Sequence, residues 1–167
     1  MLKEKLQKDL NESLKSGEQL KRLVLSWLMT AIKNRELAKR QQLSKTVNDV
    51  KELEKQSQLA DEEVIEVIAN EVKKRKESAE QFQAGGRDEL AQKEKTEMAI
   101  LLTYLPEQMS EEEIRAEIQK VISELDVPPA GGLGPKDMGK VIGNSMVRLK
   151  GRADGSTVSK IVKELLQ

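Results

Sequence analysis

Apolar residues recur at helical spacing along most of this chain, and that periodicity constrains its fold more than any other feature. Leu2, Leu6, Leu10 and Leu14 lie four residues apart, which places them on one face of a helix. Nowhere does an alternation of apolar and polar residues persist long enough to predict a strand. Aromatic residues make up only 2% of the chain, and the abundant residue types are good helix formers. We therefore expect an all-α protein.

Turn and capping signals divide this periodicity into separate helices. Asp61 is expected to cap one helix, Gly85 and Gly86 to break the chain, and Ser110 to open a capping box with Glu113. The apolar run LVLSWLMTAI at residues 23–32 predicts the helix at the centre of an N-terminal bundle. The expected helices span about residues 2–16, 19–39, 61–84, 88–105, 110–125, 135–149 and 155–166.

Two stretches lack a helical pattern. Residues 40–59 are polar without a clean apolar face, so we interpret them as a linker or an irregular helical excursion. PPAGGLG at residues 128–134 predicts a surface loop, and Pro135 fits the first position of the helix after it. A domain boundary is expected near residues 105–109. This divides the chain into an N-terminal helical bundle, residues 1–107, and a small C-terminal three-helix unit, residues 108–167.

The composition excludes much enzyme chemistry. The chain has no Cys and no His, which removes thiolate nucleophiles, the commonest general base and the usual zinc ligands. The glutamates at 62–63 and 111–113 lie at expected helix starts, where capping and the helix dipole explain them. We expect no catalytic residue, no metal and no cofactor.

The N-terminus predicts where the protein resides. MLKEKLQKDL is charged and amphipathic, without the apolar core of a secretory signal. The longest apolar run, residues 23–32, is far shorter than the roughly 20 residues of a membrane span. We therefore expect a cytoplasmic protein with no membrane partner.

Charge is unevenly distributed, although Lys and Arg together equal Asp and Glu. Residues 135–167 hold seven basic and three acidic side chains, which points weakly to an anionic partner. On a helical wheel, Lys140, Asn144 and Arg148 form one row. Gly139 and Gly143 flank the apolar arc, so we expect a neighbouring backbone to approach there, with a nucleic-acid phosphate as the alternative. The arc itself consists of Met138, Val141, Ile142, Met146 and Leu149.

The turn LKGRADG at residues 149–155 has a structural and a functional interpretation. Gly151 can take the left-handed conformation that ends a helix, and Asp154 can cap the next one. Capping does not explain why Lys150 and Arg152 join Lys140 and Arg148 at this end. A solvated basic face and a phosphate-contacting patch both remain open, and the second requires all four cations to be exposed in one patch.

Three segments resemble the YqeY-like proteins of the GatB/YqeY family: QFQAGGRDELAQKE at 81–94, YLPEQMSEEEI at 104–114, and PKDMGKVIGNSMVRLKGRADGSTVSKIVKELL at 135–166. The last also resembles the C-terminal tail of GatB, a subunit of the tRNA-dependent amidotransferase. The matching positions are Lys136, Gly139, Gly143, Met146, Lys150, Gly151, Arg152 and Ala153, with Asp154 where the tail usually has Asn. Residues 40–59 and PPAGGLG are longer than the family pattern.

This resemblance implies an all-helical fold, an N-terminal bundle, a three-helix C-terminal unit, and a tail that contacts tRNA while the amidotransferase chemistry lies elsewhere. The first functional hypothesis is therefore a non-catalytic module for tRNA or another structured RNA. Its expected phosphate contacts are Lys140, Arg148, Lys150 and Arg152, with Asn144 as a polar contact. The alternative is an adaptor that packs its glycine-flanked face on a protein partner, for which an acidic surface is suited.

Overall fold

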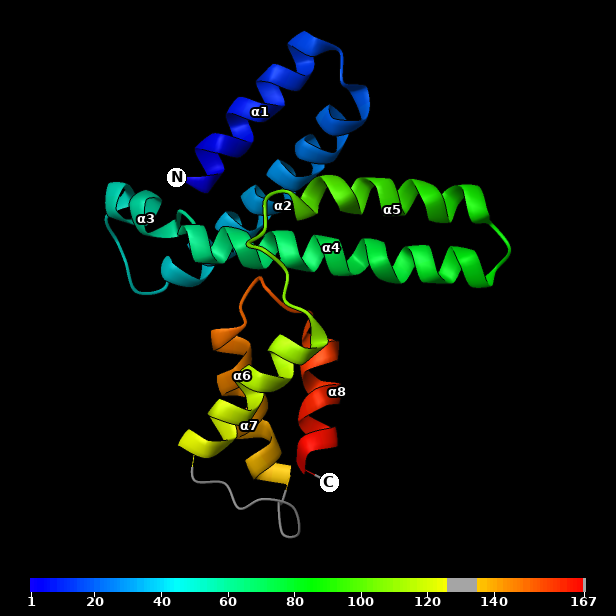
Figure 1. The fold of residues 1–167 in the computed structure, drawn as a ribbon. Helices are drawn as coiled ribbons and strands as arrows, with labels where there is room; N and C mark the ends of the chain where they lie inside the picture. Colours follow the sequence, from blue (N-terminus) through cyan, green and yellow to red (C-terminus); the bar gives the residue numbers. More distant parts are fainter. Residues whose placement is uncertain (126–134, 167) are drawn as a thin grey trace. The chain divides into compact units, whose positions relative to one another are not determined.

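The computed structural model describes residues 1–125 and 135–166, and all regular secondary structure in these ranges is α-helical (Figure 1). The expected all-α fold is confirmed. The helices are α1 (Leu2–Ser16), α2 (Gln19–Leu43), α3 (Val50–Ser57), α4 (Asp61–Ala84), α5 (Asp88–Leu102), α6 (Glu111–Glu124), α7 (Pro135–Arg148) and α8 (Gly155–Leu166). Among the described residues, no helix is both long enough and apolar enough to cross a membrane.

The chain forms two compact units, Met1–Tyr104 and Leu105–Gln167. The expected division into domains after residue 107 stays a prediction. In the N-terminal unit, α1 and α2 form one helical hairpin and α4 and α5 form another (Figure 1). Both hairpins turn at a glycine with positive φ, Gly17 at 76° and Gly86 at 68°, a conformation that costs glycine little.

Helix α2 packs against α1, α3, α4 and α5, which agrees with its long apolar run. Its buried residues are Val24, Leu25, Leu28 and Ile32. The apolar surface is not fully covered, because Leu23 and Trp27 stay exposed. On α1, Leu6 is buried but Leu14 is exposed, so the leucine row meets the core over only part of its length.

Residues 40–59 are mostly helical. Helix α2 continues to Leu43 and α3 begins at Val50, so the helical interpretation of this stretch is confirmed and the linker interpretation is wrong. The carboxylate of Asp49 accepts a hydrogen bond from the backbone N–H of Glu52 at 2.8 Å, which satisfies an otherwise unpaired amide of the first turn. Helix α3 then packs on α2.

The expected N-cap at Asp61 is wrong by one residue. Ala60 is the N-cap residue of α4, with extended backbone, and Glu63 Oε2 accepts a hydrogen bond from Ala60 N at 2.9 Å. Asp61 is already helical, and its Oδ1 accepts from Leu2 N at 2.9 Å. Its side chain therefore ties the start of α1 to the start of α4.

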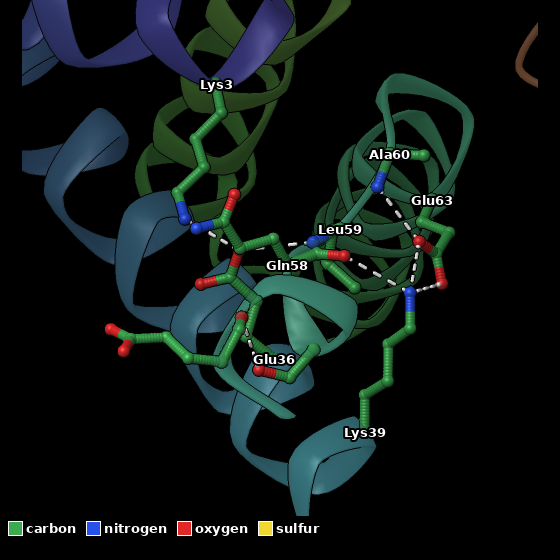
Figure 2. Close-up of polar contacts among 9 residues, drawn as sticks. Lys3, Glu36, Lys39, Gln58, Leu59, Ala60 and Glu63 are labelled. Atoms are coloured by element: carbon green, nitrogen blue, oxygen red, sulfur yellow. Dashed lines mark hydrogen bonds and ion pairs between the residues drawn. The ribbon is translucent and has the colours of Figure 1, made fainter. Parts of the chain in front are cut away.

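A polar network fastens the segment before α4 to α2 (Figure 2). Lys39 Nζ donates to Glu63 at 2.7 and 2.9 Å and to the carbonyl of Gln58 at 3.2 Å. Glu36 Oε1 accepts from Leu59 N at 3.3 Å and from Lys3 Nζ at 2.6 Å. The network thus joins α1, α2 and the α3–α4 connection through half-buried side chains.

One ion cluster lies inside the N-terminal unit. Arg75 is 9% exposed and donates to Glu97 Oε2 at 3.3 Å and to Glu71 Oε2 at 3.1 Å, and Glu97 is 3% exposed. The guanidinium also lies 6.0 Å from the ring centroid of Trp27. This cluster connects α4, α5 and α2, and the apolar pattern of the sequence did not predict it.

The C-terminal unit contains α6, α7 and α8, which all contact one another. The predicted capping box is confirmed, because Ser110 Oγ accepts from Glu113 N at 3.3 Å and Glu113 Oε2 accepts from Ser110 N at 2.8 Å. Helix α7 begins at Pro135 as predicted, whereas the loop predicted at 128–134 lies outside the described residues. The core is formed by Ile114, Ile118, Val121, Val141, Leu149, Val158, Ile161, Val162 and Leu166.

Candidate functional site

The turn between α7 and α8 has the two local features that the sequence predicted. Gly151 has φ 73°, and the amides of Arg152 and Ala153 donate to Leu149 O at 2.9 and 3.2 Å. Asp154 directly precedes Gly155, the first residue of α8, and its Oδ1 accepts a hydrogen bond from Ser156 N at 3.4 Å. Its other carboxylate oxygen accepts from the Ser156 hydroxyl. The structural roles of Gly151 and Asp154 are confirmed.

The same turn is held from outside by the segment that leads into α6. Gln108 Nε2 donates to Gly151 O at 2.7 Å, and Met109 N donates to Arg152 O at 2.9 Å. These contacts join residues more than 40 positions apart, and nothing in the local sequence indicates them. We call this pair of hydrogen bonds the strap.

The predicted polar row lies along the exposed side of α7. Lys140, Asn144 and Arg148 are all exposed, and Asn144 Nδ2 donates back to Lys140 O at 2.9 Å. Lys140 Nζ lies 4.0 Å from Asp137 Oδ1. Arg152 is also exposed, with Nε 3.5 Å from the carbonyl of Glu107. Lys150 is half-buried, so the expectation that all four cations are exposed is wrong for this residue and is met by the other three.

Carboxylates of α6 face two of these cations. Both terminal nitrogens of Arg148 donate to Glu124, one to Oε1 at 3.0 Å and the other to Oε2. The hydrogen bond and charge of Glu124 raise the pKa of Arg148. The pKa of Glu117 is lowered mainly by its hydrogen bond from Lys120, and in smaller part by the charges of Arg148 and Arg152. Both arginines therefore lie in the field of one acidic helix.

Gly139 and Gly143 pack against no neighbouring backbone in residues 1–125 and 135–166. Both are exposed, and a Cβ added at either position would meet no atom of these residues within 4 Å. The expected close helix crossing is wrong, because α7 packs through its opposite face, where Val141 and Leu149 are buried. The closely packed glycine is Gly155, where a Cβ would lie 3.1 Å from Met146 Cε. The alternative, approach of a phosphate at Gly139 and Gly143, stays a prediction.

The model of a protein family described as "Yqey-like protein" matches residues 3–166. The chain belongs to the YqeY-like family. Over 60 residues, 35% of this chain, it is 40% identical to one subunit of the glutamyl-tRNA(Gln) amidotransferase of Thermococcus gammatolerans (strain DSM 15229 / JCM 11827 / EJ3). The matched part is 9% of that relative. The resemblance seen in the sequence is confirmed, including the relation to an amidotransferase component.

This YqeY-like protein also carries a buried hydroxyl in the core of its C-terminal unit. Ser145, on α7, is fully buried, and its Oγ has no hydrogen-bond partner among the described residues. A buried polar group without a partner is destabilising relative to an apolar group of the same shape. Ser145 was not predicted as a notable residue, although its position four residues from both Val141 and Leu149 places it on the buried face.

In the N-terminal unit of the YqeY-like protein, the pKa shift of Tyr104 has a structural cause. Tyr104 donates to Asp9 Oδ2 at 2.8 Å, and burial together with this carboxylate raises the pKa of the phenol. Among the described residues, no three Asp or Glu side chains lie close enough together to hold a metal ion. A hollow of about 340 Å³ between α1 and α2 has a mainly apolar lining, formed by Leu10, Asn11, Leu14, Arg22, Leu23 and Ser26.

Proposed function

We propose that this YqeY-like protein is a non-catalytic accessory protein that binds tRNA or another structured RNA. The binding surface consists of the exposed side of α7 and the turn after it, and the setting is tRNA-dependent amidotransferase-type function. The main support for this proposal is the open helical surface at Gly139 and Gly143, which lies beside the row formed by Lys140, Asn144 and Arg148.

The glycines support this proposal because packing does not explain them. Glycine in a helix interior costs up to about 1 kcal/mol relative to alanine. Since a Cβ added at Gly139 or Gly143 would meet no atom of the described residues within 4 Å, a ligand that approaches the backbone there would offset that cost. A phosphate–sugar backbone is such a ligand, and Lys140 would lie beside it.

The kind of RNA recognition follows from the side chains available. The chain has one Trp, one Tyr and one Phe, and none of them lies in α7 or the turn. Stacking on splayed bases is therefore a minor contribution, and shape with backbone contacts dominates. The name of the amidotransferase relative makes tRNA the first ligand to test.

A protein partner is the second candidate, and one observation favours it. Val147 is 76% exposed and lies four residues after Gly143, so Gly139, Gly143 and Val147 form a smooth, weakly apolar row. A partner helix could pack there. Counterion release makes RNA binding fall steeply with salt, whereas such a packed interface depends on salt much less.

The test is a titration of total tRNA into the purified full chain at about 50 mM and about 200 mM salt. The Lys140→Glu/Arg152→Glu double variant is expected to lose at least about tenfold in affinity at the lower salt. The control is Lys93→Glu/Lys95→Glu on α5, which changes net charge equally in the other unit. Absence of tRNA binding at low salt would reject the RNA proposal and favour the protein partner.

A further inference from the structure

The ion pairs of α6 suggest how the RNA surface selects its ligand, an inference that rests on the proposed function. We propose that Glu124 is a specificity-determining residue. In the free protein its carboxylate competes with phosphate for Arg148, so that a ligand with several phosphates displaces it and an isolated phosphate does not.

The geometry of the Arg148 guanidinium sets up this competition. A guanidinium binds a carboxylate and a phosphate in the same way, through two parallel N–H donors. In Arg148 both terminal nitrogens already donate to the two oxygens of Glu124. The carboxylate therefore uses the donors that a phosphate of the RNA backbone would need, and binding through Arg148 requires an exchange.

The exchange of Glu124 for a phosphate at Arg148 is feasible. The side chains of Arg148 and Glu124 are 40% and 55% exposed, and an exposed ion pair shifts an equilibrium by no more than about five-fold. A single phosphate gains from Arg148 little more than Glu124 already provides. A polyanion also contacts neighbouring cations and releases its condensed counterions. This additional free energy favours displacement of Glu124 from Arg148.

Further acidic side chains of α6 add to the charge beside Arg148. Glu113, Glu117 and Glu124 belong to one helix that packs against α7. The hydrogen bond from Lys120, and to a smaller extent the charges of Arg148 and Arg152, lower the pKa of Glu117. The direct contact with Arg148 is made by Glu124.

The test compares the affinity for total tRNA of the wild-type full chain with that of Glu124→Gln. We expect Glu124→Gln to bind about three- to five-fold more tightly, because Arg148 is released from its competitor. The matched control is Glu164→Gln on α8. Glu164 is 42% exposed and pairs with Arg115 at 2.5 Å, so this variant makes the same charge change in the same unit at a carboxylate paired with α6 and not with α7.

Arg148→Ala, made in both backgrounds, separates competition from a general charge effect. In the wild-type background we expect less than about a two-fold change, whereas in Glu124→Gln it should remove the whole gain. Inorganic phosphate at millimolar concentration, used as a competitor, should displace tRNA no better from wild type than sodium chloride of equal ionic strength does. Thermal unfolding of each variant verifies that the unit is folded.

The outcomes distinguish this inference from the proposed function. If wild type binds tRNA but Glu124→Gln binds no better than Glu164→Gln, Glu124 does not compete with the RNA, and the proposed RNA function stands. If Arg148→Ala weakens binding equally in both backgrounds, Arg148 already contacts RNA and the competition is also wrong. If no variant binds tRNA at low salt, the proposed function itself fails.

Discussion

Arg75 in the N-terminal unit and Arg148 in the C-terminal unit make similar contacts in opposite environments. Arg75 is 9% exposed and is shared between Glu71 and the buried Glu97, whereas the Arg148 side chain is 40% exposed beside Glu124. Removing one member of a buried pair leaves a charge in the interior, while water replaces the partner of an exposed one. Burial therefore makes the first pair structural and leaves the second available for exchange.

The same contrast holds for polar and backbone features of the two units. In the N-terminal unit, Asp61, Glu36 and Glu63 all accept backbone amides or a lysine. In the described part of the C-terminal unit, the hydroxyl of Ser145 has no hydrogen-bond partner and two glycines, Gly139 and Gly143, have no packing neighbours. Local rules of stability are most often broken where function requires it, which agrees with a ligand surface on α7.

Replacing Arg75 by alanine is the strongest test of this contrast. The change leaves Glu97 buried without its cation, so we expect the free energy of unfolding to fall by about 3 kcal/mol or more. Arg148→Ala should leave it nearly unchanged, because water replaces the partner of an exposed charge. Urea unfolding followed by circular dichroism measures both variants, and Trp27 fluorescence follows the N-terminal unit. Equal effects of the two variants would remove the distinction between buried and exposed pairs.

Ser145→Ala should stabilise the C-terminal unit. The substitution removes a buried hydroxyl without a partner and introduces the best helix former, so a gain of about 1 kcal/mol is expected. Differential scanning calorimetry of the full chain would record it as a higher unfolding temperature. A loss of stability would show that the hydroxyl is hydrogen-bonded in solution, and the contrast between the units would weaken.

Gly143→Ala is expected to raise stability by up to about 1 kcal/mol, because the new methyl group meets no atom of the described residues. The close approach of a neighbouring backbone, expected there from the sequence, would have given a loss of stability instead. Gly151→Ala is the control with opposite sign, since φ of 73° is unfavourable for alanine. If Gly143→Ala also weakens tRNA binding, the glycine serves the ligand and not the fold.

Of the substitutions predicted to change stability, Glu63→Gln is expected to change the free energy of unfolding least. The hydrogen bond from Lys39, followed by that from Ala60, lowers the pKa of Glu63 from its ordinary 4.5. The ionised form therefore stabilises the fold above about pH 4.5, and the contribution is lost as pH falls through the lower folded-state pKa. Since the side chain is partly exposed, we expect a loss of about 0.5 kcal/mol near pH 7.

Urea unfolding of Glu63→Gln at about pH 7, 5 and 3 gives the pH dependence. The difference from wild type should shrink at the lowest pH, where Glu63 is itself protonated. Glu62→Gln, an exposed neighbour in the same first turn, controls for the helix dipole. A difference that is the same at every pH would assign the effect to hydrogen-bond geometry and not to charge.

Local signals made most of the fold predictable. Gly86, Gly151 and the Ser110 box each act within a few residues, and all three were identified from the sequence. Asp49 carries an equally local cap, with Glu52 three residues later, but α3 was left open between linker and helix because its residues show no clean apolar face. The partner of Asp61 is Leu2, 59 residues away, and the sequence contains no trace of that contact.

The candidate site was predictable only along α7 itself. Periodicity placed Lys140, Asn144 and Arg148 on one row, and all three are exposed there. The carboxylates of α6 were missed because their position depends on how α6 packs against α7. Glycine spacing suggested close packing at Gly139 and Gly143, but spacing does not specify what lies outside a helix. Gly155, which does pack closely on Met146, resembled an ordinary turn residue.

The strap also defines the smallest piece of this protein that could be transplanted. The helix–turn–helix pattern that resembles the GatB tail lies at residues 135–166, yet Gly151 O and Arg152 O accept hydrogen bonds from Gln108 and Met109. A graft of α7 and α8 alone would leave both carbonyls without these donors and omit the α6 side of the core. A chimaera that keeps the turn in its native shape must therefore begin before Gln108, at the start of the unit and not at the start of α7.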